Sequence, residues 1–197
     1  MKKLSIFSMA LFTGAFAFVA CNNTPSAKNP DSEKVASEAN DQKIETTTFE
    51  KDADALVKLA SQGHYLSAAA SYATNNANQK QVKTLAKTIA DDHSSMKSEI
   101  STLAAKKNYQ IPDSMSNEYV SDVADMKNWK KGKEFDTKFV NRIIDEHEKA
   151  IKILENCAID TKDADLKTWC EKHLPGLRSH LEESRKVKEE IESVYKS

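Results

Sequence analysis

The chain has 197 residues, enough for one domain of ordinary size with additional terminal segments. It is 39% hydrophobic and 30% charged and contains only 4 Gly and 4 Pro, a composition typical of helical proteins because helix breakers are scarce. The formal net charge is −1 and no basic face stands out, so we expect no nucleic-acid partner.

Residues 1–20 are predicted to be a lipoprotein signal peptide. Two lysines precede the nearly unbroken apolar stretch Leu4–Ala20, which has the charge pattern and length of a secretory signal. The stretch ends in Phe-Val-Ala-Cys, which resembles a bacterial lipobox with Phe18 in place of the usual Leu. Lipidated Cys21 would then hold the protein at the outer membrane, facing either the periplasm or the cell surface. The alternative is an uncleaved anchor helix, which also predicts export.

Residues 21–46 are expected to form a flexible tether. The segment contains two prolines, many Ser, Asn, Asp and Glu residues and almost no large apolar side chain. Such a segment buries too little surface to offset the entropy lost on ordering. We therefore divide the chain into a signal peptide (1–20), a tether (21–46) and a helical domain (47–197).

Apolar residues of the helical domain recur every three or four positions, the spacing of one buried helical face. The pattern predicts long helices over residues 49–75, 78–107, 134–158 and 163–196, and a short helix over 117–129. Short connections should make antiparallel hairpins of the first two and the last two long helices. The predicted fold class is all-α, a ferritin-like four-helix bundle of two antiparallel hairpins with a long crossover containing a short helix. The alternative is an up-down-up-down bundle with an insertion.

Each predicted long helix carries a histidine near its midpoint on the apolar stripe: His64, His93, His147 and His180. Because the midpoints of bundled helices meet at one level, we expect these four residues to form a layer. Buried imidazoles without partners cost a few kcal/mol each, so they should bond to one another, a carboxylate, water or a metal. A metal or cofactor site, a structural polar layer and a pH-responsive core remain open.

The surroundings of these histidines favour some metal chemistries over others. A di-iron carboxylate centre needs Glu-x-x-His on two helices, and this chain lacks that spacing. An imidazole-dominated site suits a single transition metal, such as zinc, copper, nickel or iron. Asp92, Glu146 and Glu148 each stand beside a histidine and are candidate partners for the outer ring nitrogens, with solvated surface charges as the alternative.

Two cysteines besides Cys21 flank the last short connection, Cys157 and Cys170. In an exported protein we expect them to form a disulfide, which would stabilise the fold by about 3 kcal/mol. The alternatives are two buried thiols, or Cys170 with His173 as a minor metal pair.

Three parts of the chain match a known family in order. They are a helix pair with Asp92-His93, a later Phe-Asp that opens the helix of His147, and Leu-Pro-x-Leu-x-x-His-Leu ending at residue 181. In these motifs the chain resembles the family called domain of unknown function 4142, over about residues 53–184. The resemblance implies a ferritin-like, exported and often lipid-anchored protein, with family histidines at His93, His147 and His180. The family's first helix usually carries a glutamate in the region where this chain has His64.

The function predicted from the sequence is that of an exported, lipid-anchored helical domain of unassigned activity, binding a metal or small ligand through the histidine layer. The membrane is the expected partner, through Cys21, and no protein partner is indicated. No nucleophile elbow, phosphate loop or zinc-protease motif is present, so an enzyme is not favoured. The alternative is a mononuclear metal-dependent oxidase or hydrolase that uses the same histidines.

Overall fold

The computed structural model describes residues 30–43 and 47–196. Within these ranges all regular structure is helical and no strand occurs, so the chain is all-α as predicted. The helices are α1 (Ser32–Asp41), α2 (Thr47–Asn76), α3 (Lys80–Lys107), α4 (Asn117–Lys127), α5 (Lys133–Asp160) and α6 (Ala164–Val194). The predicted signal peptide and the predicted lipidation site Cys21 lie outside the described residues.

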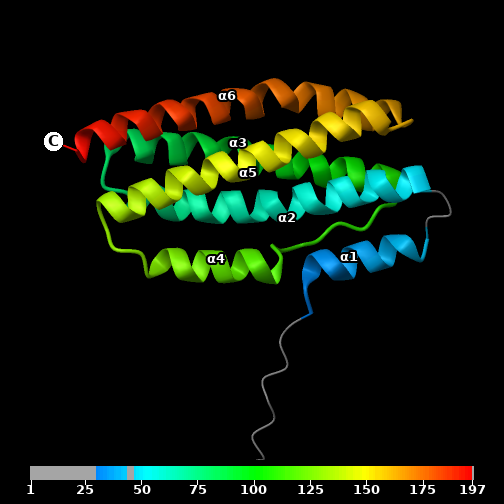
Figure 1. Cartoon of the computed structure of the whole chain (residues 1–197). Coiled ribbons are helices and arrows are strands. Elements are labelled where there is room, and N and C mark those ends of the chain that lie inside the picture. Colours follow the sequence, from blue (N-terminus) through cyan, green and yellow to red (C-terminus); the bar gives the residue numbers. More distant parts are fainter. Residues whose placement is uncertain (1–29, 44–46, 197) are drawn as a thin grey trace, which may run out of the picture.

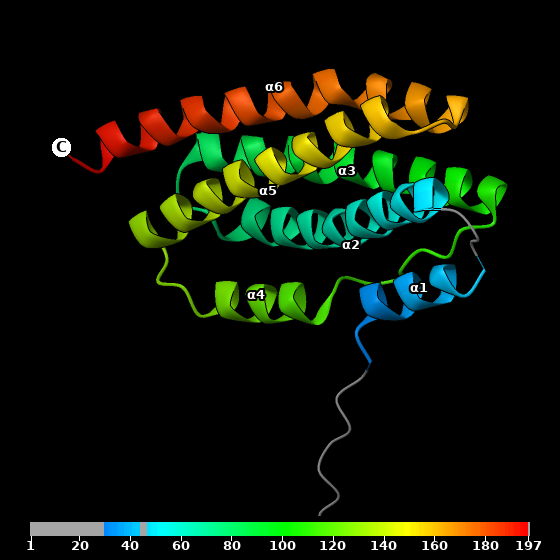
Figure 2. The same ribbon diagram turned by 45° about the vertical axis from the view of Figure 1, so that its right-hand side comes forward.

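The four long helices α2, α3, α5 and α6 lie side by side, and the shorter α1 and α4 run along the α2 side of them (Figures 1 and 2). The closest associations are α2 with α3 and α5 with α6, and each of these pairs is an antiparallel hairpin. Residues 108–132 contain α4 and return along the molecule, so α5 begins at the end where α2 stops (Figure 1). This path gives α3 and α5 the same direction.

Capping residues account for several helix ends. The Oγ atom of Ser116 accepts a hydrogen bond from the backbone N–H of Tyr119 and starts α4, and Asp163 does the same for Leu166 at the start of α6. Asn108 ends α3 with a left-handed backbone, at φ 58°. The predicted ends of the long helices agree with the structure to within three residues.

The interior consists of two apolar clusters with a buried polar layer between them. One cluster includes Leu66, Ile89 and Phe139, and the other includes Leu56, Ile100 and Leu154. Each such side chain contributes about 1.5–3 kcal/mol when fully buried. The buried polar residues between the clusters are Gln62, His93, Glu146, His147, His180 and Ser184.

Helix α1 corrects the prediction of a flexible tether over residues 21–46 for the part from Ser32 to Asp41. Its first turn is capped by Asp31, and Asn40 exchanges two hydrogen bonds, 2.8 and 2.7 Å long, with the backbone of Gln110. Ala36 is buried on the same side. The prediction was wrong here because it considered apolar burial alone, whereas bonds between side chains and backbone hold this polar helix in place.

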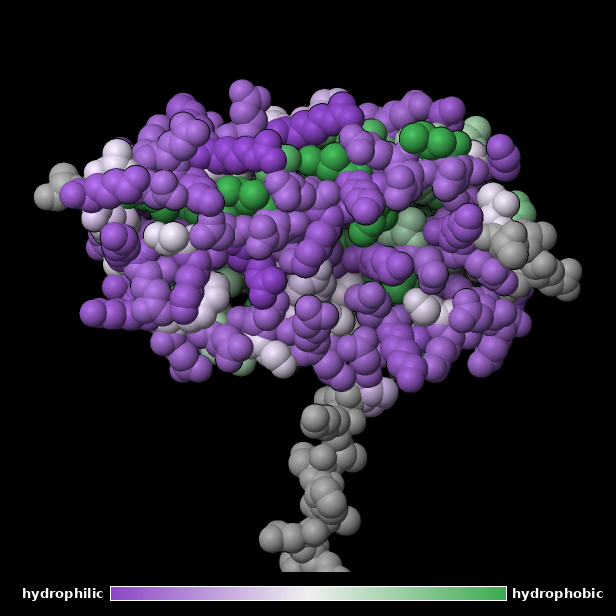
Figure 3. Space-filling model, in the orientation of Figure 1, coloured by the Kyte–Doolittle hydropathy of each residue, from purple (hydrophilic) through white to green (hydrophobic). Residues whose placement is uncertain are grey.

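The outer surface is mainly polar. Figure 3 shows one face of the molecule, on which hydrophilic residues predominate and apolar residues appear in the gaps between them. Within the described ranges, none of the helices combines the length and the hydropathy that a membrane span requires.

Candidate metal centre

Three imidazoles meet halfway along the long helices, from His93 on α3, His147 on α5 and His180 on α6. The Nε2 atom of His147 lies 3.3 Å from Nε2 of His93 and 3.3 Å from Nδ1 of His180. The three nitrogens all lie within 4.8 Å of one another, and all three residues are buried. The structure thus brings together three of the four histidines of the predicted layer.

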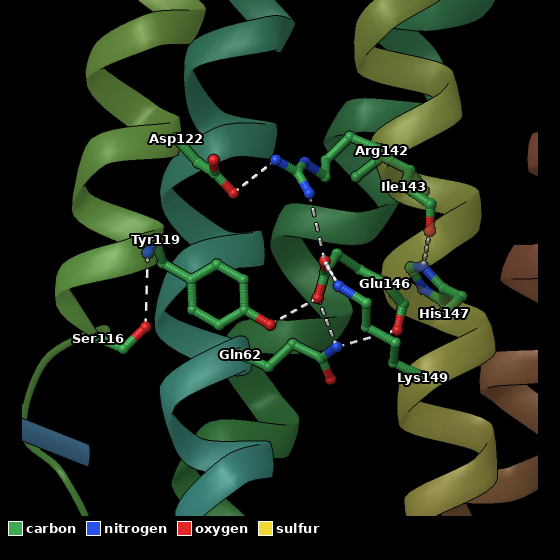
Figure 4. A network of polar contacts seen from close by, with 9 residues as sticks. All are labelled: Gln62, Ser116, Tyr119, Asp122, Arg142, Ile143, Glu146, His147 and Lys149. Carbon is green, nitrogen blue, oxygen red and sulfur yellow. Dashed lines mark hydrogen bonds and ion pairs between the residues drawn. The ribbon is translucent and has the colours of Figure 1, made fainter. Parts of the chain in front are cut away.

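The outer nitrogens of two of these rings are already used. Nδ1 of His147 donates a hydrogen bond to the carbonyl oxygen of Ile143 at 2.8 Å, which Figure 4 includes. Nε2 of His180 donates to Oδ2 of Asp92 at 2.9 Å. When both rings are neutral, these bonds leave lone pairs on Nε2 of His147 and Nδ1 of His180, which face each other. A proton or a metal ion between the two nitrogens relieves this contact.

Burial makes protonation of these rings unfavourable. It lowers the pKa of His147 to about 4, because the imidazolium form loses its hydration. Burial also holds the pKa of His93 well below its ordinary value, and repulsion from the charged forms of His147 and His180 adds to this. His93 and His147 are therefore neutral near pH 7, which is the form that binds metals.

Two of the three spacings between these nitrogens match those around a transition-metal ion. Zinc binds histidine nitrogen at about 2.0–2.1 Å, so two such nitrogens on a tetrahedral ion lie about 3.3–3.4 Å apart. The separations from His147 to His93 and to His180 are both 3.3 Å. Three protein ligands leave a fourth position open, as in catalytic zinc sites. Within the described residues the group contains histidines alone, and this ligand set suits zinc, copper, nickel or a single iron.

His64 lies outside the cluster, so its predicted place in the layer is wrong. Its half-buried side chain lines a surface hollow with Lys97 and is bonded to the backbone of Pro112. The residue of α2 that points inward at this level is Gln62, which is 3% exposed. At 3.6 residues per turn, a side chain two positions away points about 200° around the helix.

The error over His64 arose from the choice of stripe on α2. The apolar spacing that places His64 on the stripe includes Leu56 and Ala60, which are buried, but it begins at Phe49, which is 43% exposed, and ends at Ser71, which is also exposed. The stripe that stays buried along the helix shares Leu56 and contains Leu59, Gln62, Leu66, Ala69 and Ala73. Its larger apolar residues were the signal in the sequence that could have identified Gln62.

The predicted carboxylate partners occupy different environments. Asp92 does contact a histidine of the cluster, but it is His180 on another helix rather than its neighbour His93. Glu148 is exposed and forms an ion pair with Arg185 at 2.7 Å. For Glu148 the alternative of a solvated surface charge is correct, because its side chain and that of Arg185 on α6 are both exposed.

Glu146 is fully buried but faces α2 and α4 rather than the histidines (Figure 4). Its Oε2 atom accepts hydrogen bonds from Gln62 Nε2 at 2.7 Å and from the Tyr119 hydroxyl at 2.6 Å. Oε1 accepts from Lys149 at 2.8 Å, and Gln62 also donates to the backbone carbonyl of Glu146 at 2.9 Å. Burial raises the pKa of Glu146, but the bonds from Gln62, Lys149 and Tyr119 outweigh it and leave the pKa lowered.

This network ties three helices together beside a residue of the cluster, since Glu146 immediately precedes His147 on α5. Sequence reasoning missed Gln62 and Tyr119, which link α2 and α4 to that turn of α5. Glu146 thus bonds to Gln62, Tyr119 and Lys149, and its charge rather than a hydrogen bond is what reaches the His147 imidazole.

The two remaining cysteines lie close together at the end of the molecule where α5 meets α6. Cys157 and Cys170 are both buried and are free thiols here. The neighbouring Cys157 thiol and burial raise the pKa of Cys170 well above its ordinary value. The expected disulfide between them stays a prediction.

His173, the other member of the alternative metal pair with Cys170, bonds to a different residue. Its Nε2 atom donates a hydrogen bond to Glu99 at 2.9 Å.

Comparison with known proteins identifies a family for this chain. A family model described as Domain of unknown function (DUF4142) matches residues 34–187, which include the three clustered histidines and Asp92. Neither the curated proteins nor the solved structures give a match to the chain. The family model covers well over half of the sequence, and the chain therefore belongs to the family of unknown function DUF4142.

Proposed function

We propose that this protein is an exported, lipid-anchored member of its family that binds one transition-metal ion through His93, His147 and His180. The observation that carries the proposal is the pair of 3.3 Å separations between three buried ring nitrogens. The bonds to Ile143 and Asp92 add to it, because metal-binding histidines usually donate their other N–H to a carbonyl or carboxylate.

A ferritin-like four-helix bundle is the fold that we propose for this site. Two antiparallel hairpins joined by one crossover that returns along the molecule support this arrangement. Bundles of this kind build metal sites from side chains on facing helices at mid-length. The present set has three imidazoles and no carboxylate, which favours a single ion over a di-iron centre.

Export and anchoring at the outer membrane belong to the same proposal, and the sequence of residues 1–21 supports them. Nine residues separate Cys21 from Asp31, which caps α1. Ten extended steps of the chain span at most about 35 Å. A lipid on Cys21 would therefore keep the helical domain close to the membrane surface.

Metal analysis of the mature chain tests the binding function. The protein would carry Cys21→Ser, contain no purification tag of histidines and be dialysed after incubation with zinc or copper. We expect one metal ion per chain, lost in His93→Ala and His147→Ala and retained in the matched control His64→Ala. Protein that remains metal-free and is not stabilised by either ion would refute the proposal.

Anchoring is tested separately in cells that express the full chain. We expect a labelled fatty acid to be incorporated into the protein and to be absent from Cys21→Ser. Unlabelled protein in the soluble periplasmic fraction would refute anchoring and leave the metal site unaffected.

A mononuclear metal-dependent oxidase or hydrolase is the second candidate function. It is favoured by a hollow of about 190 Å³ that opens beside His93 and His180. An enzyme needs access for a substrate to the open metal position, and a purely structural metal site does not.

A further inference from the structure

The hollow beside the cluster lies between α3 and α6. Its lining includes His93 and His180 from the cluster, together with Ser95, His173 and Gly176. All residues that line it come from these two helices. It is therefore bordered by other helices than the Glu146 network, which faces α2 and α4.

His173 stands on the same face of α6 as His180, two helical turns earlier. Its Nε2 atom donates a hydrogen bond to Glu99 at 2.9 Å, and its ring packs against Trp169 with 4.7 Å between the ring centroids. Glu99 also accepts from Lys172 at 2.8 Å. These contacts hold the ring, and in its neutral form the proton that bonds to Glu99 is on Nε2 and the lone pair is on Nδ1.

The chemistry of the two sides of the hollow defines what would bind there. A metal held by the cluster would present a Lewis-acidic position that takes an oxygen or nitrogen donor. Nδ1 of His173 would accept a hydrogen bond from an N–H or O–H group of the same ligand. The volume of about 190 Å³ admits a molecule of a few non-hydrogen atoms.

We infer that this hollow is the binding site for a small protic oxygen-donor ligand, which coordinates the metal and donates a hydrogen bond to His173. The inference rests on the proposed metal site and adds the class of ligand and a residue that selects it. His173 and Glu99 then form a pair in which the carboxylate orients the imidazole toward the ligand.

Space around Gly176 allows the hollow to be blocked without disturbing the helix. A Cβ atom at this position would meet no heavy atom within 4 Å. Leu is a good helix former, so Gly176→Leu should fold and fill part of the hollow. Gly176→Ala adds only the Cβ atom and serves as the matched control.

Cobalt(II) is the probe for both the metal site and the ligand site in the hollow, because its visible absorption reports its coordination. The mature chain with Cys21→Ser would be loaded with cobalt and titrated with acetohydroxamate, which has an N–H group, and with azide, which has none. We expect both ligands to change the spectrum of the bound cobalt. We expect His173→Phe to weaken acetohydroxamate binding about tenfold and to leave azide binding unchanged.

Different results would refute the proposed metal site and the proposed ligand site in the hollow. Cobalt that does not bind at one per chain refutes the proposed function. Cobalt that binds but responds to neither ligand overturns the inference and leaves the metal site standing. Equal acetohydroxamate affinity in wild type and His173→Phe overturns the role of His173, and equal affinity in Gly176→Leu and Gly176→Ala overturns the location of the ligand.

Discussion

Nε2 of His147 and Nδ1 of His180 lie 3.3 Å apart, and the other nitrogen of each ring donates to a separate acceptor. The two atoms that face each other are therefore both acceptors when the rings are neutral. Nε2 of His93, at 3.3 Å from His147, completes a triangle around the same space. A cation at this point would satisfy all three nitrogens at once.

The bond between His180 and Asp92 should raise the affinity of the site for metal. A carboxylate that accepts the outer N–H makes the imidazole a stronger donor and fixes its orientation, and loss of such a partner typically costs 10–100-fold in affinity. Because Asp92 is largely exposed, we expect Asp92→Asn to lower zinc affinity about tenfold, the smaller end of that range. Competition with a zinc chelator measures this change.

The matched control for this substitution is Asp91→Asn, at the position next to Asp92. It removes only a surface ion pair with Lys87. We expect its zinc affinity to equal that of the wild type. If Asp92→Asn binds zinc with the same affinity as Asp91→Asn and the wild type, Asp92 has no influence on the metal.

The helices themselves were predictable because the apolar spacing of each is regular and polar breaks separate them. His93, His147 and His180 were also predictable, since each lies on the clear apolar stripe of a helix with one exposed side. Helix α2 is different. It packs against α1, α3, α4 and α5, so it is buried on several sides and its sequence admits more than one stripe.

Hydrogen-bond partners that are distant in sequence could not be predicted from the spacing of residues within one helix. Asp92 stands next to His93 but bonds to His180, and Glu146 stands next to His147 but bonds to Gln62. In both cases the helix rotation sends neighbours in sequence to different faces. Helix α1 was missed for a related reason, because its two bonds to Gln110 join segments 70 residues apart.

Stability of the metal-free protein should fall in mild acid because of the buried histidines. An unfolded histidine has a pKa near 6.5, whereas burial lowers that of His147 to about 4. Between these values the unfolded chain binds more protons, so stability rises with pH, is fully present above about pH 6.5 and is lost as the pH falls through about 4. His93 acts in the same direction.

The contribution of His147 over this range is about 3 kcal/mol. Denaturant unfolding between pH 7 and pH 4.5, in the presence of a chelator, measures it. His147→Leu removes the titrating group at similar volume, so its unfolding free energy should depend less on pH. An identical pH dependence in this variant would contradict the assignment.

Glu146 and Glu148 offer a comparison of two carboxylates on one turn of α5. Glu146→Leu would remove the carboxylate that accepts from Tyr119 and from Gln62, leaving the buried Gln62 amide with only the backbone carbonyl, and we expect a loss of about 3–5 kcal/mol of unfolding free energy. Glu148→Leu would remove only an exposed ion pair with Arg185, and we expect a loss below about 1 kcal/mol. Urea unfolding of both variants measures the difference, and equal losses would show that the buried network adds nothing.

Cys157 and Cys170 should form a disulfide when the protein is oxidised, because both are buried side by side across the short connection from α5 to α6. The raised pKa of Cys170 leaves little thiolate, so the reduced, folded protein should react slowly with iodoacetamide and oxidise slowly. Once closed, the loop should add about 3 kcal/mol of stability. In the Cys21→Ser chain isolated from the periplasm, a thiol count in denaturant should therefore give none before reduction and two after it. Two thiols before reduction, in protein that an oxidant does not stabilise, would leave the pair as buried packing residues.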